Sequence, residues 1–552
     1  MSLTVRLFRD DRRCLLLVLP LALLLFAAGL GDRDLWDPDE PRTAEIASEI
    51  LASGSWAVLH ENGGLYVEKP PLAFWLAAAC SLPAGRVTEF TIRLPSSLAA
   101  VCGVAVLFYL GRALFGRRSG ALAAVVLLTT QDYFMEARWA HPDMLWTLFL
   151  TSACLFFYLA YRPDGARGWL AAFYVALGLA ILTKGPAALL IVLLAILLFL
   201  AATGDLRFLR RAGLPWGVPL AVLPAALWLV AYASSAGMRF PLGEAFARIG
   251  RRVAHGVHHP HPFGHVLTAL TVELLPWTLF LPGALWHTFP HRHGRRDPET
   301  AYLYSWVLAV FSVFALSAEK RGVYLLPLLP LLVVPIGRLW DTALMHWEPS
   351  PVERAVFWPL VTAFLLACGF GTFYVARVGR EMPDLRGPAV ALAAAAVLSS
   401  VVALAVRRLR GEGAALGAFT AGLAACYVII ALLVLPALDR YKSARPFGAR
   451  IAAAAGGAPL AIYPDPHDAY AFYSGRAIRV LPSREALRTF LGSAPDVFCL
   501  MDEDRLAVER RLLGLPLRVL DRERVGHRAM VLVAASRPQD PAGAPPKGRT
   551  AP

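Results

Sequence analysis

The chain has 552 residues, of which 57% are hydrophobic and 17% are charged, and its mean hydropathy is +0.54. An apolar share this high excludes an ordinary soluble domain and indicates a protein that crosses a membrane several times. The net charge of +14 does not indicate nucleic-acid binding, because much of it is arginine in short loops, as expected on the cytoplasmic side of a membrane. Only Cys499 of the seven cysteines lies outside an apolar stretch, so we expect neither a disulfide framework nor a zinc cluster.

The first apolar stretch, residues 14–30, follows four arginines within the first 13 residues. A basic segment before a short apolar run is also typical of a secretory signal peptide. Because many later segments must also span the membrane, an uncleaved first helix with a cytoplasmic N-terminus is the simpler interpretation.

Thirteen apolar runs approach the length of about 20 residues that a membrane-spanning helix needs. They lie near residues 14–31, 93–111, 119–133, 143–161, 168–184, 185–203, 214–236, 265–287, 300–318, 322–340, 355–375, 386–406 and 415–437. The sequence therefore predicts a polytopic α-helical membrane protein with about 13 spans, in a transmembrane domain that covers residues 1–437.

A further apolar stretch, residues 71–84, is compatible with either a short span or a helix at the membrane interface. The compact arginine-rich loops should be cytoplasmic, and they alternate across the membrane only if residues 71–84 do not cross it. These loops are residues 112–118, 162–167, 204–213, 288–299 and 407–413. Residues 32–92 are then predicted to form one long external loop, on the same side as everything after residue 437.

The C-terminal part, residues 438–537, has apolar runs of strand length that alternate with amphipathic segments, which predicts a small soluble α/β domain. The expected strands are 459–463, 477–481, 496–501, 517–520 and 529–535, with helices near 483–493 and 502–513. Residues 538–552, rich in Pro, Gly and Ala, are expected to be disordered.

Asp39 and Glu40 come soon after the first apolar span. Acidic residues and proline are common at a helix N-terminus, which is one explanation of this segment. The other is a general base or a metal ligand, because a carboxylate next to the bilayer can take a proton from an attacking hydroxyl.

Glu68 and Lys69 follow Tyr66 and precede two prolines. Lys69 together with Arg42 forms a candidate clamp for an anionic head group, with phosphate as the expected ligand. A lysine whose charge reaches the interface from a helix start is the alternative.

Asp143 begins a predicted span, and Lys184 lies between two apolar runs. Asp143 is compatible with a helix cap or with a second acidic position in a site. A charge at membrane depth costs about 3 kcal/mol, so Lys184 is expected to face a polar cavity, unless it lies in a tight external turn.

Two further groups of charged residues lie in predicted external loops. The histidines His255, His258, His259, His261 and His265 suggest a metal site, although a pH-responsive loop or one that faces lipid head groups fits as well. Tyr324 follows Lys320 and Arg321, which indicates either a phosphate pocket or an ordinary interfacial anchor.

Five motifs together resemble the lipid-carrier-dependent glycosyltransferases of the GT-C fold, in the branch of protein O-mannosyltransferases and bacterial aminoarabinose (4-amino-4-deoxy-L-arabinose) lipid A transferases. They are the DE-x-R of Asp39, Glu40 and Arg42, the Y-x-EKPP that starts at Tyr66, the R-x(4)-D of Arg138 and Asp143, the TKGP around Lys184, and the KRGVYLLPLLP of 320–330. The resemblance covers nearly the whole chain.

The resemblance implies a role for each matching residue. Asp39 is expected to be the catalytic carboxylate, with Glu40 beside it and Asp143 as a second acidic residue of the catalytic group. The residues expected to contact and stabilise the donor phosphate are Arg42, Tyr66, Lys69, Lys184, Arg248 and Tyr324. Departure of a phosphate is promoted by fixed positive charge, and inversion at the anomeric carbon is the expected outcome.

The resemblance also makes a divalent metal, zinc, magnesium or manganese, a candidate cofactor. Its expected ligands are Glu68 and a histidine from 255–261, His259. This chain departs from the family where related enzymes tend to have Glu-His before the arginine of that loop, because Glu244 is followed by Ala245.

The implied function is transfer of a sugar, aminoarabinose or another, from an undecaprenyl-phosphate carrier to lipid A or another envelope acceptor. The setting is the bacterial inner membrane, with the domain at 438–537 in the periplasm. A protein O-mannosyltransferase-like enzyme differs only in its acceptor. A lipid-head-group flippase is the non-enzymatic alternative. Transporters tend to have repeated halves and ionisable groups at mid-membrane, whereas here the charges concentrate in predicted external loops and no repeat is visible.

Overall fold

The computed structural model describes residues 10–237, 264–289, 297–318, 320–345, 381–494, 496–514, 517–526 and 528–535, with isolated positions within 241–262 and 359–380. The chain forms two compact units, each built from separate segments. The helical unit contains residues 1–33, 47–59 and 65–437, and the sheet unit contains residues 34–46, 60–64 and 438–552. The predicted disordered tail, 538–552, lies outside the described residues.

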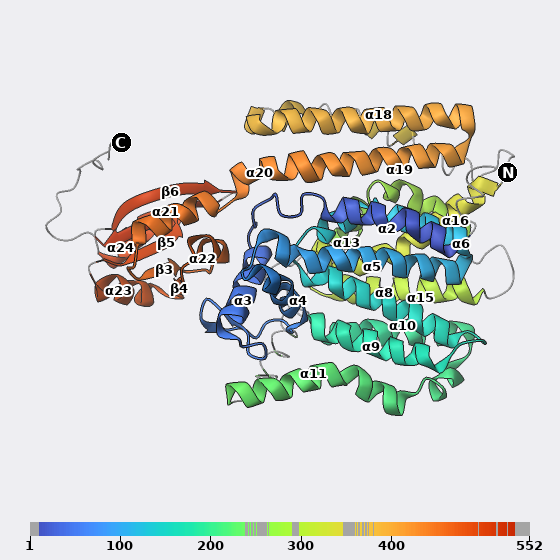
Figure 1. The fold of residues 1–552 in the computed structure, drawn as a ribbon, viewed down its shortest axis with the longest axis horizontal. Coiled ribbons are helices and arrows are strands. Elements are labelled where there is room, and N and C mark those ends of the chain that lie inside the picture. Colours follow the sequence, from blue (N-terminus) through green and yellow to red (C-terminus); the bar gives the residue numbers. More distant parts are fainter. Residues whose placement is uncertain are drawn as a thin grey trace. The chain divides into compact units, whose positions relative to one another are not determined.

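The helical unit is a bundle in which α5, α8 and α9 lie side by side and α18 pairs with α19 (Figure 1). Its longer helices are α2 (Asp11–Ala27), α5 (Glu89–Phe115), α6 (Arg117–Leu128), α8 (Pro142–Tyr161), α9 (Arg167–Lys184), α10 (Ala187–Thr203), α11 (Leu214–Ala236), α15 (Pro298–Leu316), α16 (Leu329–Met345), α18 (Arg386–Arg410) and α19 (Glu412–Ile429). Its shorter helices are α4 (Leu72–Ser81), η1 (Leu82–Ala84), α7 (Gln131–Ala137), η2 (Leu206–Arg210), α13 (Gly264–Glu273), η3 (Trp277–Phe280), α14 (Leu281–Thr288), η5 (Gly322–Leu328), η6 (Pro383–Leu385) and η7 (Ile430–Val434).

Within the described residues, eight helices are long and apolar enough to cross a membrane, or nine if the pair 264–273 and 277–288, bent by 110°, counts as one span. The chain is therefore polytopic, with eight or nine candidate spans among the described residues against the thirteen predicted. Three predicted spans correspond to shorter helices, α2 and α10 with 17 residues each and α6 with 12. The predicted span 355–375 lies in a segment of which only isolated positions are described.

The predicted span 119–133 ends early, at Leu128, where four polar residues, 129–132, begin. Thr129 Oγ1 donates to the carbonyl of Val125 at 2.8 Å, and Thr130 Oγ1 donates to the carbonyl of Val126 at 2.9 Å. Trp277 Nε1 and Tyr427 Oη both donate to the Thr129 carbonyl at 3.1 Å, which satisfies an acceptor freed at the end of α6.

Glycine permits close contact between α6 and α16. A Cβ added at Gly337 of α16 would lie 2.6 Å from the Ser119 carbonyl oxygen and the Ala123 nitrogen, which are backbone atoms of α6. Small residues of this kind let membrane helices approach closely. In contrast, a Cβ added at Gly417 of α19 would meet nothing within 4 Å.

We therefore expect Gly337→Ala to lower the free energy of unfolding by about 1–3 kcal/mol through overpacking. Gly417→Ala is the matched control, expected to be neutral or slightly stabilising because alanine favours a helix. Thermal unfolding of the two variants in detergent measures the difference. Equal midpoints would contradict the close contact at Gly337.

The predicted external loop, residues 32–92, contains ordered elements in both units. Helix α3 (Asp39–Ser53) is followed by a hairpin of β1 (His60–Glu61) and β2 (Gly64–Leu65). Helix α4 has 10 residues, so it is only about 15 Å long, half the thickness of a bilayer core. That length agrees with the expectation that residues 71–84 do not cross.

The sheet unit contains a five-stranded mixed sheet in the order β4-β3-β5-β7-β6. Strands β4, β3 and β5 are parallel, and β7 pairs antiparallel with both β5 and β6. The strands are β3 (Leu460–Tyr463), β4 (Arg479–Val480), β5 (Phe498–Asp502), β6 (Leu517–Val525) and β7 (Arg528–Ala535), and the helices are α20 (Leu435–Lys442), α21 (Arg445–Ala455), α22 (Asp468–Ser474), α23 (Arg484–Ser493) and α24 (Glu503–Leu513).

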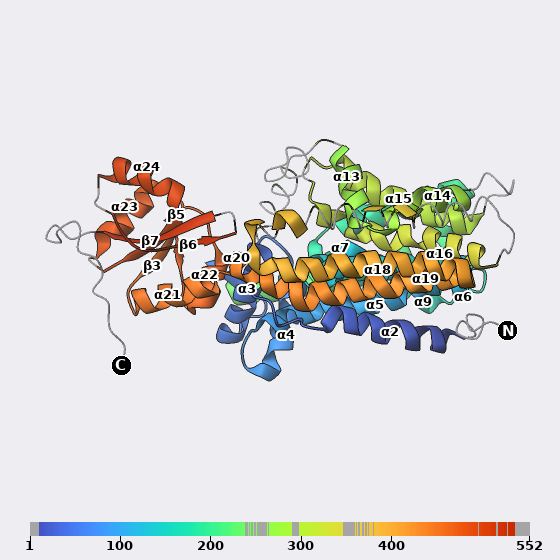
Figure 2. The same ribbon diagram turned by 90° about the horizontal axis from the view of Figure 1, so that it is seen from above.

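Alternate residues of the strands face two separate cores (Figure 2). Leu460, Ile462 and Leu500 pack with α21 and α22, whereas Ala461 and Cys499 pack with α23 and α24. The predicted α/β fold of this region is confirmed, and each predicted strand and helix is present with shifted ends. Helices α21 and α22 were not predicted.

Candidate functional site

Lys184 ends α9, and the sequence explains why the helix stops there. Gly185 has φ +90° and its N–H donates to the Ile181 carbonyl at 2.8 Å, and a proline follows. This glycine and proline pair ends a helix. Lys184 therefore lies in the last turn, where the negative end of the helix dipole favours a cation.

The Lys184 ammonium is held by one carboxylate and two aromatic rings. Its Nζ pairs with the Asp143 carboxylate and lies 5.0 Å from the ring centre of Trp146 and 4.6 Å from that of Tyr324. Asp143 is 6% exposed and lies in the first turn of α8, where the helix dipole favours an acid. The structure thus brings together three residues that the sequence analysis named separately.

This arrangement suits an anion with several oxygens. An ammonium has three N–H donors, and Asp143 accepts from one of them, so phosphate oxygens are suitable acceptors for the others. Cation–π contacts with Trp146 and Tyr324 compensate part of the cost of holding the charge among helices. Asp143 makes an ion pair, so its role is more than that of a helix cap.

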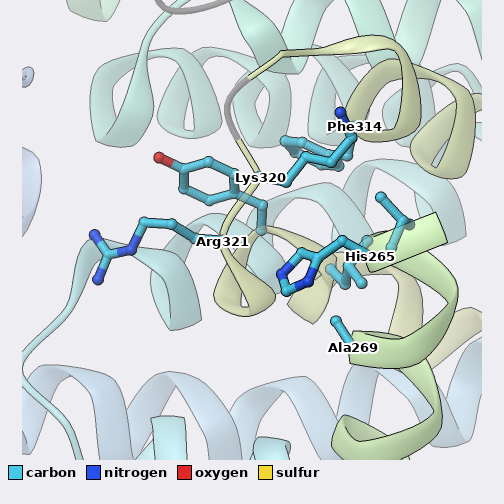
Figure 3. A pocket seen from close by; sticks show the side chains of 8 residues that line it. His265, Ala269, Phe314, Lys320 and Arg321 are labelled. Atoms are coloured by element: carbon cyan, nitrogen blue, oxygen red, sulfur yellow. The ribbon is translucent and has the colours of Figure 1, made fainter. Parts of the chain in front are cut away.

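A small pocket of about 10 Å³, room for about one water molecule, lies beside Tyr324. Figure 3 shows His265 and Ala269, on α13, opposite the loop that carries Lys320 and Arg321. The pocket is too small for a phosphate, so it does not by itself indicate an anion site.

The Y-x-EKPP segment contributes Tyr66 and Lys69 to the helical unit. Tyr66 is buried, its N–H donates to the Leu59 carbonyl at 2.9 Å, and its ring meets Phe74 edge-on with 5.3 Å between the ring centres. The charge of Lys69 acts on the Asp143 carboxylate, which places Lys69 near the pair of Asp143 and Lys184.

The proposed metal ligands receive no further support. Glu68 is exposed, and His259 lies outside the described residues, as do Arg248, His255, His258 and His261. Among the residues that the structure describes, no three His, Cys, Asp or Glu side chains are arranged to hold a metal ion.

In the sheet unit, Asp39 and Glu40 form the first turn of α3, as the helix-start interpretation expected. Glu40 is fully buried, and its Oε2 accepts a hydrogen bond from the Trp36 N–H at 3.3 Å, which stabilises the helix start. Asp39 is 8% exposed and its Oδ1 lies 3.9 Å from Arg42 Nη1. Arg42 in turn donates from Nε to Glu61 Oε1 at 2.9 Å.

The residues just before Asp39 are anchored on helices of the C-terminal domain. Asp34 pairs with Arg445 at 2.9 Å and accepts from Ser443 Oγ at 2.6 Å. Trp36 Nε1 donates to Asp439 Oδ1 at 2.8 Å, and the N–H of Leu35 donates to the Tyr473 hydroxyl at 2.7 Å. No local sequence pattern indicates these partners, because they lie some 400 residues away in the chain.

Arg138 of the R-x(4)-D motif has a structural position. It is buried, and its Nη1 donates to the carbonyls of Leu25 and Phe26 near the end of α2 at 3.1 and 3.3 Å. The guanidinium therefore satisfies acceptors that the helix end leaves open. Only Asp143 of this motif lies in the group around Lys184.

Comparison with known proteins gives a family match over part of the chain and a fold for almost all of it. Residues 68–231 match the family described as dolichyl-phosphate-mannose-protein mannosyltransferase. The chain is 34% identical, over 57% of its residues and 58% of the relative, to an undecaprenyl phosphate-alpha-4-amino-4-deoxy-L-arabinose arabinosyl transferase of Edwardsiella ictaluri. The enzyme of the same name from Yersinia enterocolitica is 30% identical over 62% of each chain. The chain thus matches less than two thirds of these relatives.

Solved structures extend the likeness to almost the whole chain. ArnT from Cupriavidus metallidurans bound to undecaprenyl phosphate superposes with a TM-score of 0.79 at 22% identity, over 95% of this chain and 98% of that one. Its apo state gives 0.78 at 24% identity, over 94% and 97%. This protein therefore has the fold of ArnT from Cupriavidus metallidurans.

Proposed function

We propose that this protein is a membrane glycosyltransferase that moves a sugar from an undecaprenyl-phosphate carrier to lipid A, on the periplasmic face of the inner membrane. The observation that carries the proposal is Lys184, held by Asp143 between Trp146 and Tyr324 as a fixed cation for a phosphate. The names of the sequence relatives, which specify undecaprenyl phosphate and 4-amino-4-deoxy-L-arabinose, favour an aminopentose as the sugar.

In the proposed reaction, an acceptor oxygen attacks the anomeric carbon and the bond from that carbon to the phosphate oxygen breaks. The bonding electrons leave with the phosphate, whose negative charge grows as the bond breaks. Asp39 takes the proton of an attacking hydroxyl, or holds the nucleophile in line. Attack opposite the leaving phosphate inverts the anomeric configuration.

The cations stabilise the leaving phosphate. Lys184, Lys69 and Arg42 supply fixed positive charge where negative charge develops, which is worth more in a site from which water is excluded. Tyr324 and Tyr66 are proposed to contact the same phosphate, Arg248 stays a predicted contact, and Glu68 and His259 stay predicted metal ligands. Glu40 is proposed to act by fixing the start of α3 beside Asp39.

Mass spectra of lipid A test the proposal directly. Cells that lack the gene are supplied with the wild-type chain or with Asp39→Asn at equal membrane expression. We expect a sugar mass on lipid A only with the wild type, and the mass difference identifies the sugar. Lipid A unchanged in both would exclude it as the acceptor.

A protein acceptor is the second candidate, and the match of residues 68–231 to the protein mannosyltransferase family favours it. In that case the same cells would carry the sugar on envelope proteins, which glycoprotein mass spectrometry detects. The two acceptors give separate signals in one experiment.

A further inference from the structure

A tight hairpin fixes two polar side chains close to α3. The turn between β1 and β2 contains Asn62 and Gly63, whose φ angles are +53° and +74°. Positive φ at both central residues defines the turn type that Asn-Gly strongly favours. Glu61 and Asn62 are therefore presented on a short, well-defined support.

These side chains meet Asp468, the first residue of α22 in the C-terminal domain. Asn62 Nδ2 donates to Asp468 Oδ1 at 2.7 Å, and Asp468 Oδ2 lies 3.6 Å from Arg42 Nε. The same Arg42 nitrogen donates to Glu61 Oε1 at 2.9 Å. Asp468 is only 3% exposed. Three carboxylates thus lie around the Arg42 guanidinium. Glu61 and Asp468 are near Nε, and Asp39 is near Nη1.

Three carboxylates, Glu61, Asp468 and Asp39, face one guanidinium here, an excess of negative charge that favours a proton on one of the acids. Burial, followed by the nearby Asp468 charge, raises the pKa of Glu61 to about 7, although Arg42 opposes the shift. Burial also raises the pKa of Asp468, although Arg42 again opposes the shift. The other charged groups nearby are Asp37, His467, which lies 3.5 Å from Asp37, and Arg528, which contacts His467. Below about pH 7 we therefore expect the two acids to hold one proton between them.

We propose that Glu61 and Asp468 are positioning residues, which share a proton and together hold the Arg42 guanidinium beside Asp39. Through Asp468, the C-terminal domain contributes to the position of Arg42 beside Asp39. This inference rests on the proposed function, because Asp39 and Arg42 take their roles from it.

The proton explains how two acids can position one cation. A protonated Glu61 donates to Asp468, so the pair carries one negative charge instead of two beside Arg42. Loss of the proton places two carboxylates side by side, and their repulsion separates the hairpin from α22. A displacement of about 1 Å at a reacting group can cost about 10²-fold in rate.

Four variants and one control test the inference in the full-length protein. Glu61→Gln and Asp468→Asn keep a hydrogen-bond donor in the pair without a shared proton, whereas Glu61→Ala and Asp468→Ala remove the contact. Asp465→Asn is the control, because Asp465 is an exposed acid three residues before Asp468. Sugar transfer from the carrier lipid is measured as kcat/KM between pH 5 and 9, with thermal unfolding at each pH.

We expect wild type and Asp465→Asn to lose activity as the pH rises through about 7. Glu61→Gln and Asp468→Asn should stay active above that pH, and the alanine variants should lose about 10²-fold throughout. Folded Glu61 keeps a proton that the unfolded chain releases above about pH 4.5, so wild-type stability should fall from there to about pH 7. Glu61→Gln should show a smaller fall.

An Asp468→Ala variant as active as wild type, or a Glu61→Gln variant with an unchanged pH profile, would overturn the inference. If the alanine variants fail to fold, the profiles of the two amide variants decide alone. A wild type that transfers no sugar at any pH would instead overturn the proposed function. The pH dependence of unfolding still tests the shared proton in that case, because it needs no substrate.

Discussion

Asp39→Asn is expected to lower kcat/KM for sugar transfer by about 10²–10⁴-fold, the range typical of losing a positioned acid or base. The change is nearly isosteric, and the hydrogen bond from Thr43 Oγ1 to the Asp39 carbonyl uses the backbone, so α3 should form normally. Because Asp39 acts on the nucleophile, binding of undecaprenyl phosphate should change little. Kinetics and lipid binding are measured on the same purified protein.

Glu49→Gln is the matched control, since Glu49 is a carboxylate farther along α3 to which no catalytic role is given. It should keep the wild-type rate. If Asp39→Asn transfers sugar as fast as wild type, Asp39 is not the catalytic carboxylate. A lipid flippase has no catalytic need for Asp39, so retained lipid movement together with absent transfer in the wild type would favour that alternative.

Lys184→Met is expected to lower kcat by about 10²–10³-fold, because the site loses a fixed cation where the phosphate charge develops. The single variant also leaves the Asp143 carboxylate buried without its partner, which can destabilise a protein by about 3–5 kcal/mol. An inactive single variant therefore has two explanations.

The double variant Lys184→Met with Asp143→Asn separates them, because it removes both charges of the pair. We expect its unfolding midpoint to return toward the wild-type value while transfer stays slow. Lys184→Arg keeps a cation near the rings of Trp146 and Tyr324 and should retain more activity than either. Recovery of transfer in the double variant would mean that Lys184 serves only to balance Asp143.

The sequence predicted the group around Lys184 better than the cluster around Arg42. Charged residues are conspicuous in an apolar chain, so Asp143, Lys184 and Tyr324 could each be selected, and the structure places them together. Asp468 carries no such signal, because it lies in a polar domain and 406 residues beyond Asn62. The Asn62-Gly63 pair, a strong hairpin signal, would have pointed to Glu61.

Within the described residues, fewer helices than predicted have the length of a span. The predicted run 119–133 included polar residues at its end, and α6 stops after 12 residues where Thr129, Thr130, Gln131 and Asp132 begin. The C-terminal strands were easier to predict, because each is a short apolar run bounded by polar turns.

The Asp34 N–H donates a hydrogen bond to Asp439 Oδ2 at 2.9 Å, and this contact sets an order of events during synthesis. The two residues are 405 positions apart, so at about 5–20 residues per second the ribosome needs roughly 20–80 s to make the second after the first. During that interval the segment that carries Asp39 cannot yet form its contacts with the residues around Asp439. The segment that carries Asp39 should therefore reach its folded position only after the residues around Asp439 have been synthesised.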